Sequence, residues 1–171
     1  MIRLVLIMMF LATGLAAQEA EPPMTYERLG KIIFALDPDA QPQGPGFEFT
    51  VSDVPVLVIT DTNADRMRAM VAIRSAEELS NQDLQRMMQA NFDSTLDARY
   101  AIANGTLWAT YIHPLSSLEK DQLISGLAQT VNIANTYGTL YSGGAAEFGG
   151  GDSHDLQREL IEDLLKKGEE I

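Results

Sequence analysis

The chain has 171 residues, and its 24 acidic against 12 basic side chains give a formal net charge of −12 at pH 7. Nucleic acid and anionic membrane surfaces attract Lys and Arg, so this charge argues against both as partners. The sequence has no cysteine, which excludes disulfides, thiol catalysis and cysteine-ligated metals.

The first residues have the pattern of an export signal. Arg3 precedes an apolar run over residues 4–12, and small residues follow up to Ala17. A basic start, a short apolar core and a small-residue zone are typical of a cleaved secretory signal. The run is shorter than the roughly 20 apolar residues that a membrane-spanning helix needs. We therefore expect a signal peptide over residues 1–17, a periplasmic or secreted protein, and no stable membrane insertion after cleavage.

Helical and strand patterns alternate after this segment. Apolar residues at helical spacing predict a first helix over Tyr26–Leu36, with Thr25 as its N-cap. Three strands are then expected, over Phe47–Val51, Val54–Ile59 and Arg68–Arg74. The run Val54–Ile59 is apolar on both of its faces, so we expect both faces of that strand to be covered.

A second helix and a hairpin follow. Ser80 and Asp83 form a capping-box pattern, which predicts a helix start. Asn104-Gly105 is the preferred pair for a two-residue hairpin turn and separates strands over Arg99–Ala103 and Thr106–His113. This turn predicts that Ile102 faces Leu107 and that Ala101 faces Trp108.

The last third of the chain is predicted to be helical around a glycine-rich connection. Ser116 and Glu119 open a long helix that closes at Gly138, residues 139–152 are a linker, and residues 153–168 form an amphipathic helix. The main domain is expected over residues 24–138. Hairpins with helices set between them predict an α+β fold, with helices packed on an antiparallel sheet of about five strands.

This element order resembles the class I type III secretion chaperone family, also called the Tir-chaperone-like domain, and the similar YbjN-like domains. The resemblance covers about residues 25–138. It is carried by the Leu29–Leu36 face, the Val54–Ile59 strand, the Asn104-Gly105 hairpin and the Leu123–Val131 stripe. It implies an acidic, mostly dimeric binding protein without catalytic residues. Members of the family are cytoplasmic, in conflict with the export signal, so the resemblance implies the fold more than the escort of a secreted effector.

Two constellations invite a catalytic or metal interpretation. Asp61, Asn63 and Asp65 have the spacing that opens a calcium loop, but Arg66 stands where that loop needs glycine, which favours a polar turn. His113 and His154 are far apart and belong to no recognisable motif. We therefore expect no catalytic residues, no cofactor and no metal.

The expected function is that of a non-catalytic protein-binding or chaperone-like module in the cell envelope, whose partner is another protein or a second copy. The alternatives are a structural subunit of an envelope assembly and a hydrolase with an unrecognised Ser/His/Asp site. Full burial of one Leu contributes about 1.5–3 kcal/mol, so the apolar stripe of the last helix must be covered by its own sheet, a twin subunit or another protein. The residues expected to bind a partner are Val56, Leu57, Val58, Leu156, Leu160, Ile161, Leu164 and Leu165.

Overall fold

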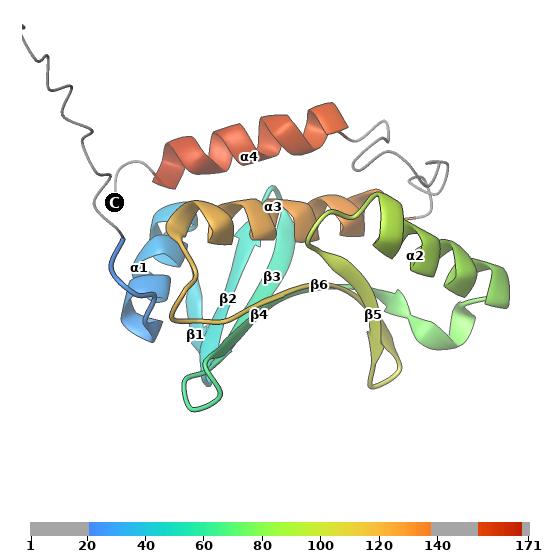
Figure 1. Cartoon of the computed structure of the whole chain (residues 1–171), viewed down its shortest axis with the longest axis horizontal. Coiled ribbons are helices and arrows are strands. Elements are labelled where there is room, and N and C mark those ends of the chain that lie inside the picture. Colours follow the sequence, from blue (N-terminus) through green and yellow to red (C-terminus); the bar gives the residue numbers. More distant parts are fainter. Residues whose placement is uncertain (1–20, 138–153, 169–171) are drawn as a thin grey trace, which may run out of the picture.

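The computed structural model describes residues 21–137 and 154–168, which form an α+β fold (Figure 1). Within these ranges, six strands make one antiparallel sheet and four α-helices accompany it. The predicted fold class is confirmed, with one strand more than expected. The expected signal peptide and the glycine-rich connection lie outside the described residues.

The sheet has the order β1-β2-β3-β4-β6-β5, and each neighbouring pair is antiparallel. Its strands are β1 (Gln41–Gln43), β2 (Gly46–Val51), β3 (Val54–Asp61), β4 (Arg66–Ser75), β5 (Arg99–Ala103) and β6 (Thr106–His113). The β5–β6 hairpin has the predicted register, with Ile102 opposite Leu107 and Ala101 opposite Trp108. The additional strand, β1, turns back on β2 through Gly44, whose φ of +56° favours glycine.

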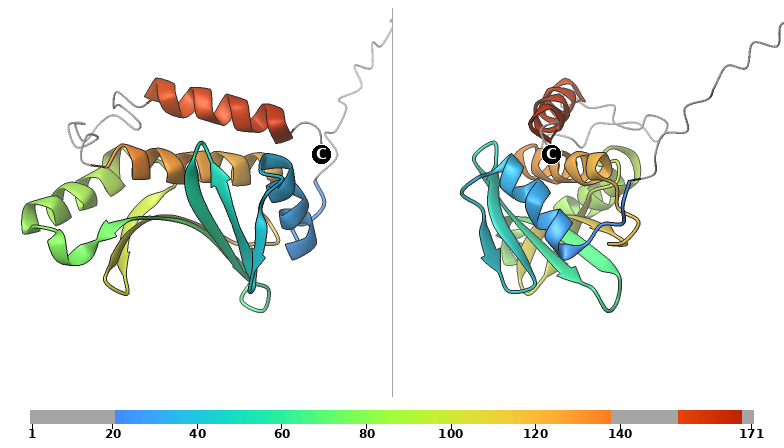
Figure 2. Two further views of the ribbon diagram at one scale, coloured as in Figure 1. Left: turned by 180° about the vertical axis from the view of Figure 1, so that it is seen from behind. Right: turned by 90° about the vertical axis from the view of Figure 1, so that its left-hand side faces the viewer.

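The helices stack on one face of the sheet. They are α1 (Tyr26–Leu36), α2 (Asn81–Asp93), α3 (Lys120–Asn135) and α4 (His154–Gly168), with a short 3-10 turn, η1 (Ala76–Glu78), before α2. Figures 1 and 2 show α3 lying along the sheet, α1 beside it, α2 projecting past β5, and α4 on the outer side of α3. No described helix covers the opposite face of the sheet. None is long and apolar enough to cross a membrane.

The helix starts follow their local sequence in two cases and not in a third. Thr25 caps α1, and Ser80 with Asp83 forms the predicted capping box of α2. Helix α3 begins at Lys120, later than expected, with Glu119 and Gln122 as its capping box. The expected cap, Ser116, instead donates its backbone N–H and its hydroxyl to the carboxylate of Asp65.

Helix α3 lies close to the sheet because Gly126 faces the ring of Tyr111. A Cβ atom at position 126 would lie 2.5 Å from two carbon atoms of that ring. Leu123, Leu127 and Val131 of the same helix are completely buried and complete the centre of the core.

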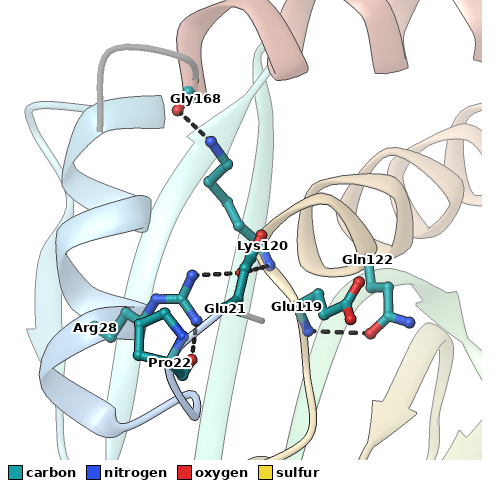
Figure 3. Close-up of polar contacts among 7 residues, drawn as sticks. All are labelled: Glu21, Pro22, Arg28, Glu119, Lys120, Gln122 and Gly168. Atoms are coloured by element: carbon teal, nitrogen blue, oxygen red, sulfur yellow. Dashed lines mark hydrogen bonds and ion pairs between the residues drawn. The ribbon is translucent and has the colours of Figure 1, made fainter. Parts of the chain in front are cut away.

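Helix α4 packs on its own domain. Leu164 is 2% exposed, and Leu160, Ile161 and Leu165 are partly buried against the core. Figure 3 shows how the C-terminal end of α4 is attached: the Lys120 side chain donates to the carbonyl oxygen of Gly168, with an N···O distance of 3.0 Å.

The same lysine also fixes the segment before α1. Its backbone N–H donates to the carboxylate of Glu21, which also pairs with Arg28 (Figure 3). The Lys120 hydrogen bond, followed by the Arg28 hydrogen bond, lowers the pKa of Glu21 below its ordinary value. Lys120 therefore joins α4, α3 and the chain before α1 at one corner of the molecule.

Candidate functional site

The face of the sheet opposite the helices carries an apolar surface. Side chains alternate along each strand, so residues between core positions point to this second face. We call it the open face. Its large apolar side chains are Leu57, Ile59, Met70, Trp108 and Ile112, from the three neighbouring strands β3, β4 and β6. Ile112 is 52% exposed, and the other four are partly exposed. An exposed cluster of large apolar residues on a soluble protein is typical of an interaction site.

Two shallow hollows are cut into the open face. The first has a volume of about 400 Å³ and is lined by Met70, Trp108 and Ile112, among others. The second, of about 360 Å³, lies at the ends of β3 and β4 nearest the turn at Asp61. The hollows share one cross-strand row, in which Arg68 of β4 lies between Ile59 of β3 and Ile112 of β6.

Two polar groups belong to this surface. Thr110 is only 7% exposed and lines the first hollow. Its Oγ1 has no hydrogen-bond partner within the described part of the chain. The indole N–H of Trp108 donates to the carbonyl oxygen of Ala103, at 3.2 Å, so it helps to orient the indole beside that hollow.

The edges of the sheet offer little to a partner strand. At one edge, β1 has three residues and contains Pro42, which has no N–H. Beyond β1, the N–H of Thr50 donates to the Asp37 carboxylate at 2.7 Å. At the other edge, the Asn91 amide of α2 bonds both the N–H and the carbonyl oxygen of Tyr100. A partner would therefore dock on a face more readily than add a strand.

The structure places the expected partner-binding residues in three locations. Val56 and Val58 point towards the helices and are completely buried in the core. Leu57 lies on the open face, opposite Met70. The α4 residues Leu160, Ile161, Leu164 and Leu165 pack within the chain, and the side chain of Leu156 lies outside the described residues. Within residues 21–137 and 154–168, helices cover only one face of Val54–Ile59, so this part of the chain does not supply the cover that was expected on the second face.

A second apolar patch lies where α2 meets β5. Its exposed residues are Met88, Phe92 and Ile102, between 50% and 68% exposed. Met88 and Ile102 line a hollow of about 270 Å³. We call this group the α2–β5 patch. It lies at one end of the sheet, next to the edge that Asn91 closes, and is distinct from the open face.

The candidate polar constellations have structural hydrogen bonds. Asp61 accepts from the backbone N–H groups of Asn63 and Ala64, which makes the expected polar turn. Asp65 accepts from Ser116, whose N–H and hydroxyl lower the pKa of its carboxyl. His113 Nδ1 donates to the carbonyl oxygen of Pro114 at 2.8 Å. Across the described ranges, no three His, Asp or Glu side chains come together as a metal site would require.

Sequence reasoning did not single out four residues of the open face: Arg68, Trp108, Thr110 and Ile112. A signal for Trp108 and Ile112 was present in the alternation of β6, where both share one face with Thr110. No pattern indicated Thr110 or Arg68, because a polar residue on a strand is normal on a solvated face.

Comparisons with known proteins find solved structures with a similar fold. Neither a scan against protein-family models nor a search of curated proteins found a match. Among solved structures, the Yersinia pestis type III secretion chaperone SycH, in complex with a stable fragment of YscM2, is similar at a TM-score of 0.51 and 16% identity. The match covers 66% of this chain and 99% of that one. The HopA1-SchA chaperone-effector complex matches at a TM-score of 0.49 and 12% identity, over 64% and 92% of the two chains.

The comparison corrects the expected location. Type III secretion chaperones are cytoplasmic, which contradicts the expectation of a periplasmic or secreted protein, and we do not retain that expectation. The predicted resemblance itself is confirmed at the level of the fold. The chain has a class I type III secretion chaperone-like fold.

Proposed function

We propose that this protein is a non-catalytic, chaperone-like binding module that holds a segment of another protein against its open face. The observation that carries the proposal is the cluster of large apolar side chains on a sheet face that no described helix covers. Leaving such a face in water is unfavourable, so a protein that keeps it has a reason to cover it with a partner.

The fold supports this role. SycH, whose fold is similar, is in complex with a fragment of another protein. The edges add a second argument. Pro42 has no N–H, and the Asp37 and Asn91 side chains bond to backbone groups of Thr50 and Tyr100, so addition of an extended segment as a further strand is hindered at both edges. We therefore favour docking of side chains on the open face. Leu57 is the one described residue of the expected partner-binding set that lies there.

The stripe of α4 takes part in partner binding only if α4 leaves α3. Its residues Leu160, Leu164 and Leu165 would then expose both their own surface and the part of α3 that they cover. We therefore assign the first contact with a partner to the open face, which is accessible with α4 in place.

We further propose that two copies associate through the α2–β5 patch. Met88, Phe92 and Ile102 are three of the five large apolar residues that are most exposed among the described ones. They lie on one helix and one neighbouring strand, so a two-fold axis beside α2 would bring each patch against its equivalent.

The test compares two isoleucines of almost equal exposure. Ile112, on the open face, is 52% exposed, and Ile102, in the α2–β5 patch, is 50% exposed. Suppression of light scattering from a thermally unfolding model protein reports binding of apolar segments, and light scattering of the protein alone reports its molecular mass. Ile112→Asp should abolish suppression and leave the mass unchanged, whereas Ile102→Asp should halve the mass and leave suppression in place.

Two results would contradict these assignments. If Ile112→Asp suppresses aggregation as well as the wild type does, the open face is not the binding surface. If the wild type has the mass of one chain, the association through α2 and β5 is wrong.

A further inference from the structure

The first hollow of the open face contains a buried hydroxyl that lacks a partner. Thr110 lies on β6 between Met70 of β4 and Arg99 of β5, one strand in from the edge of the sheet. Its Oγ1 bonds to no described group. Buried hydroxyls in proteins are normally hydrogen-bonded, because removal from water without a new partner is unfavourable. A hydroxyl left in this state on the floor of an apolar hollow is suited to a group brought by a ligand.

The row between the two hollows contains a cation without an ion pair. Arg68 lies between Ile59 and Ile112, and no carboxylate of the described residues is within ion-pair distance of it. Asp61, the acidic residue that lines the second hollow, accepts hydrogen bonds from the backbone of its own turn. The guanidinium is therefore available to an anion that arrives together with an apolar group.

We propose that this row and the first hollow form an anchor site for an acidic and apolar segment of the partner protein. A large apolar side chain of the segment enters the hollow between Trp108 and Ile112, and a neighbouring carboxylate pairs with Arg68. The Thr110 hydroxyl bonds to a polar group of the same segment. The inference rests on the proposed function and adds the chemistry of the partner to it.

The charge of the whole chain makes this inference specific. With a net charge of −12, the protein attracts basic segments over long range. At the anchor site we expect the opposite preference, for acidic segments, because Arg68 would contact the bound segment directly and partly out of water. A measured preference for acidic segments would therefore have to come from the site itself.

Trp108 supplies the assay, because it is the only tryptophan of the chain and lines the hollow. The probes are two short synthetic peptides with the same two leucines in a Gly-Ser frame, one with aspartate next to each leucine and one with lysine. Trp108 emission is followed while each peptide is added to the full protein. We expect the aspartate peptide to bind about 3- to 10-fold more tightly at low salt, with the difference shrinking at high salt.

Variants then assign the preference to residues. Arg68→Gln should remove the preference between the peptides, and Arg68→Lys should keep most of it. Thr110→Val, which has nearly the same shape, should weaken both peptides by a similar factor and leave the melting temperature of the free protein no lower. Far-UV circular dichroism checks that each variant is folded.

The outcomes separate this inference from the proposed function. Equal binding of the two peptides by the wild type, a preference for lysine, or a preference that survives Arg68→Gln would overturn the acidic anchor. If Ile112→Asp still abolishes binding in those cases, the open face remains the binding surface. If neither peptide changes Trp108 emission, the anchor site is refuted. If Ile112→Asp then also leaves the suppression of aggregation unchanged, the proposed function is refuted together with the anchor site.

Discussion

Replacement of Leu164 by alanine tests whether α4 is a separable layer. Leu164 is 2% exposed and is the most buried described side chain of the α4 stripe. Truncating a buried leucine to alanine costs about 2–5 kcal/mol in a rigid core. Helix α4 packs mainly against α3 and more weakly against α1. If α4 can detach by itself, the free energy lost in the variant cannot exceed the free energy with which this one helix docks on them. We expect α4 to detach while the sheet stays folded.

Hydrogen exchange followed by mass spectrometry measures this directly. In Leu164→Ala, amides of residues 158–168 should lose protection, whereas amides of β3 and β6 should exchange as in the wild type. Glu162→Ala is the matched control, because Glu162 lies on the exposed side of the same helix and its loss should leave α4 protected. Equal loss of protection in α4 and β6 would refute the reasoning, since it would make α4 part of one cooperative core.

Three further substitutions test individual contacts. Glu21→Gln should lower the melting temperature at neutral pH. Because the pKa of Glu21 is lowered, its carboxylate contributes to stability above the ordinary value of 4.5 and loses that contribution as the pH falls below it. The melting temperatures of the variant and the wild type should therefore converge in acid. A difference in melting temperature that does not change with pH would contradict the Lys120 and Arg28 contacts. Gly126→Ala should lower the free energy of unfolding, measured in urea, by about 1–3 kcal/mol, because the new methyl group clashes with Tyr111. This loss is expected even though alanine favours a helix by about 1 kcal/mol over glycine. A more stable variant would show that the Tyr111 ring moves aside. Asn91→Leu should lower the free energy of unfolding by about 1–3 kcal/mol, because it leaves the N–H and the carbonyl oxygen of Tyr100 without their partner. An unchanged urea midpoint would show that water replaces the Asn91 amide.

The elements that were predictable are those decided by a few neighbouring residues. Asn104-Gly105 determines both the turn and the register of β5 on β6. Ser80 and Asp83 satisfy each other at the start of α2. Strand β1 could not be predicted, because Gln41, Pro42 and Gln43 carry no apolar alternation and pair with β2 through the backbone alone. The start of α3 was misjudged because Ser116 bonds to Asp65, 51 positions earlier in the chain.

The candidate site could be predicted only in part for a related reason. The two-sided apolar run Val54–Ile59 correctly indicated that the sheet has apolar residues on both faces. Tertiary packing decides which face the helices cover. As a result, Val56 is buried in the core and Leu57 lies on the open face. The role of Thr110 depends on the neighbours that bury it, and no local pattern records them.

The closed sheet edges have a consequence for the solubility of the protein itself. An apolar sheet face with open edges is the geometry from which fibrils grow, since each added molecule extends both the backbone ladder and the apolar layer. Here the ladder is stopped by single side chains: Pro42 and the Asp37 carboxylate at one edge, and the Asn91 amide at the other. We expect these three residues to hinder polymerisation through the sheet edges while the open face is in water. Their loss would lower the concentration at which the protein stays in solution, even where the fold itself survives.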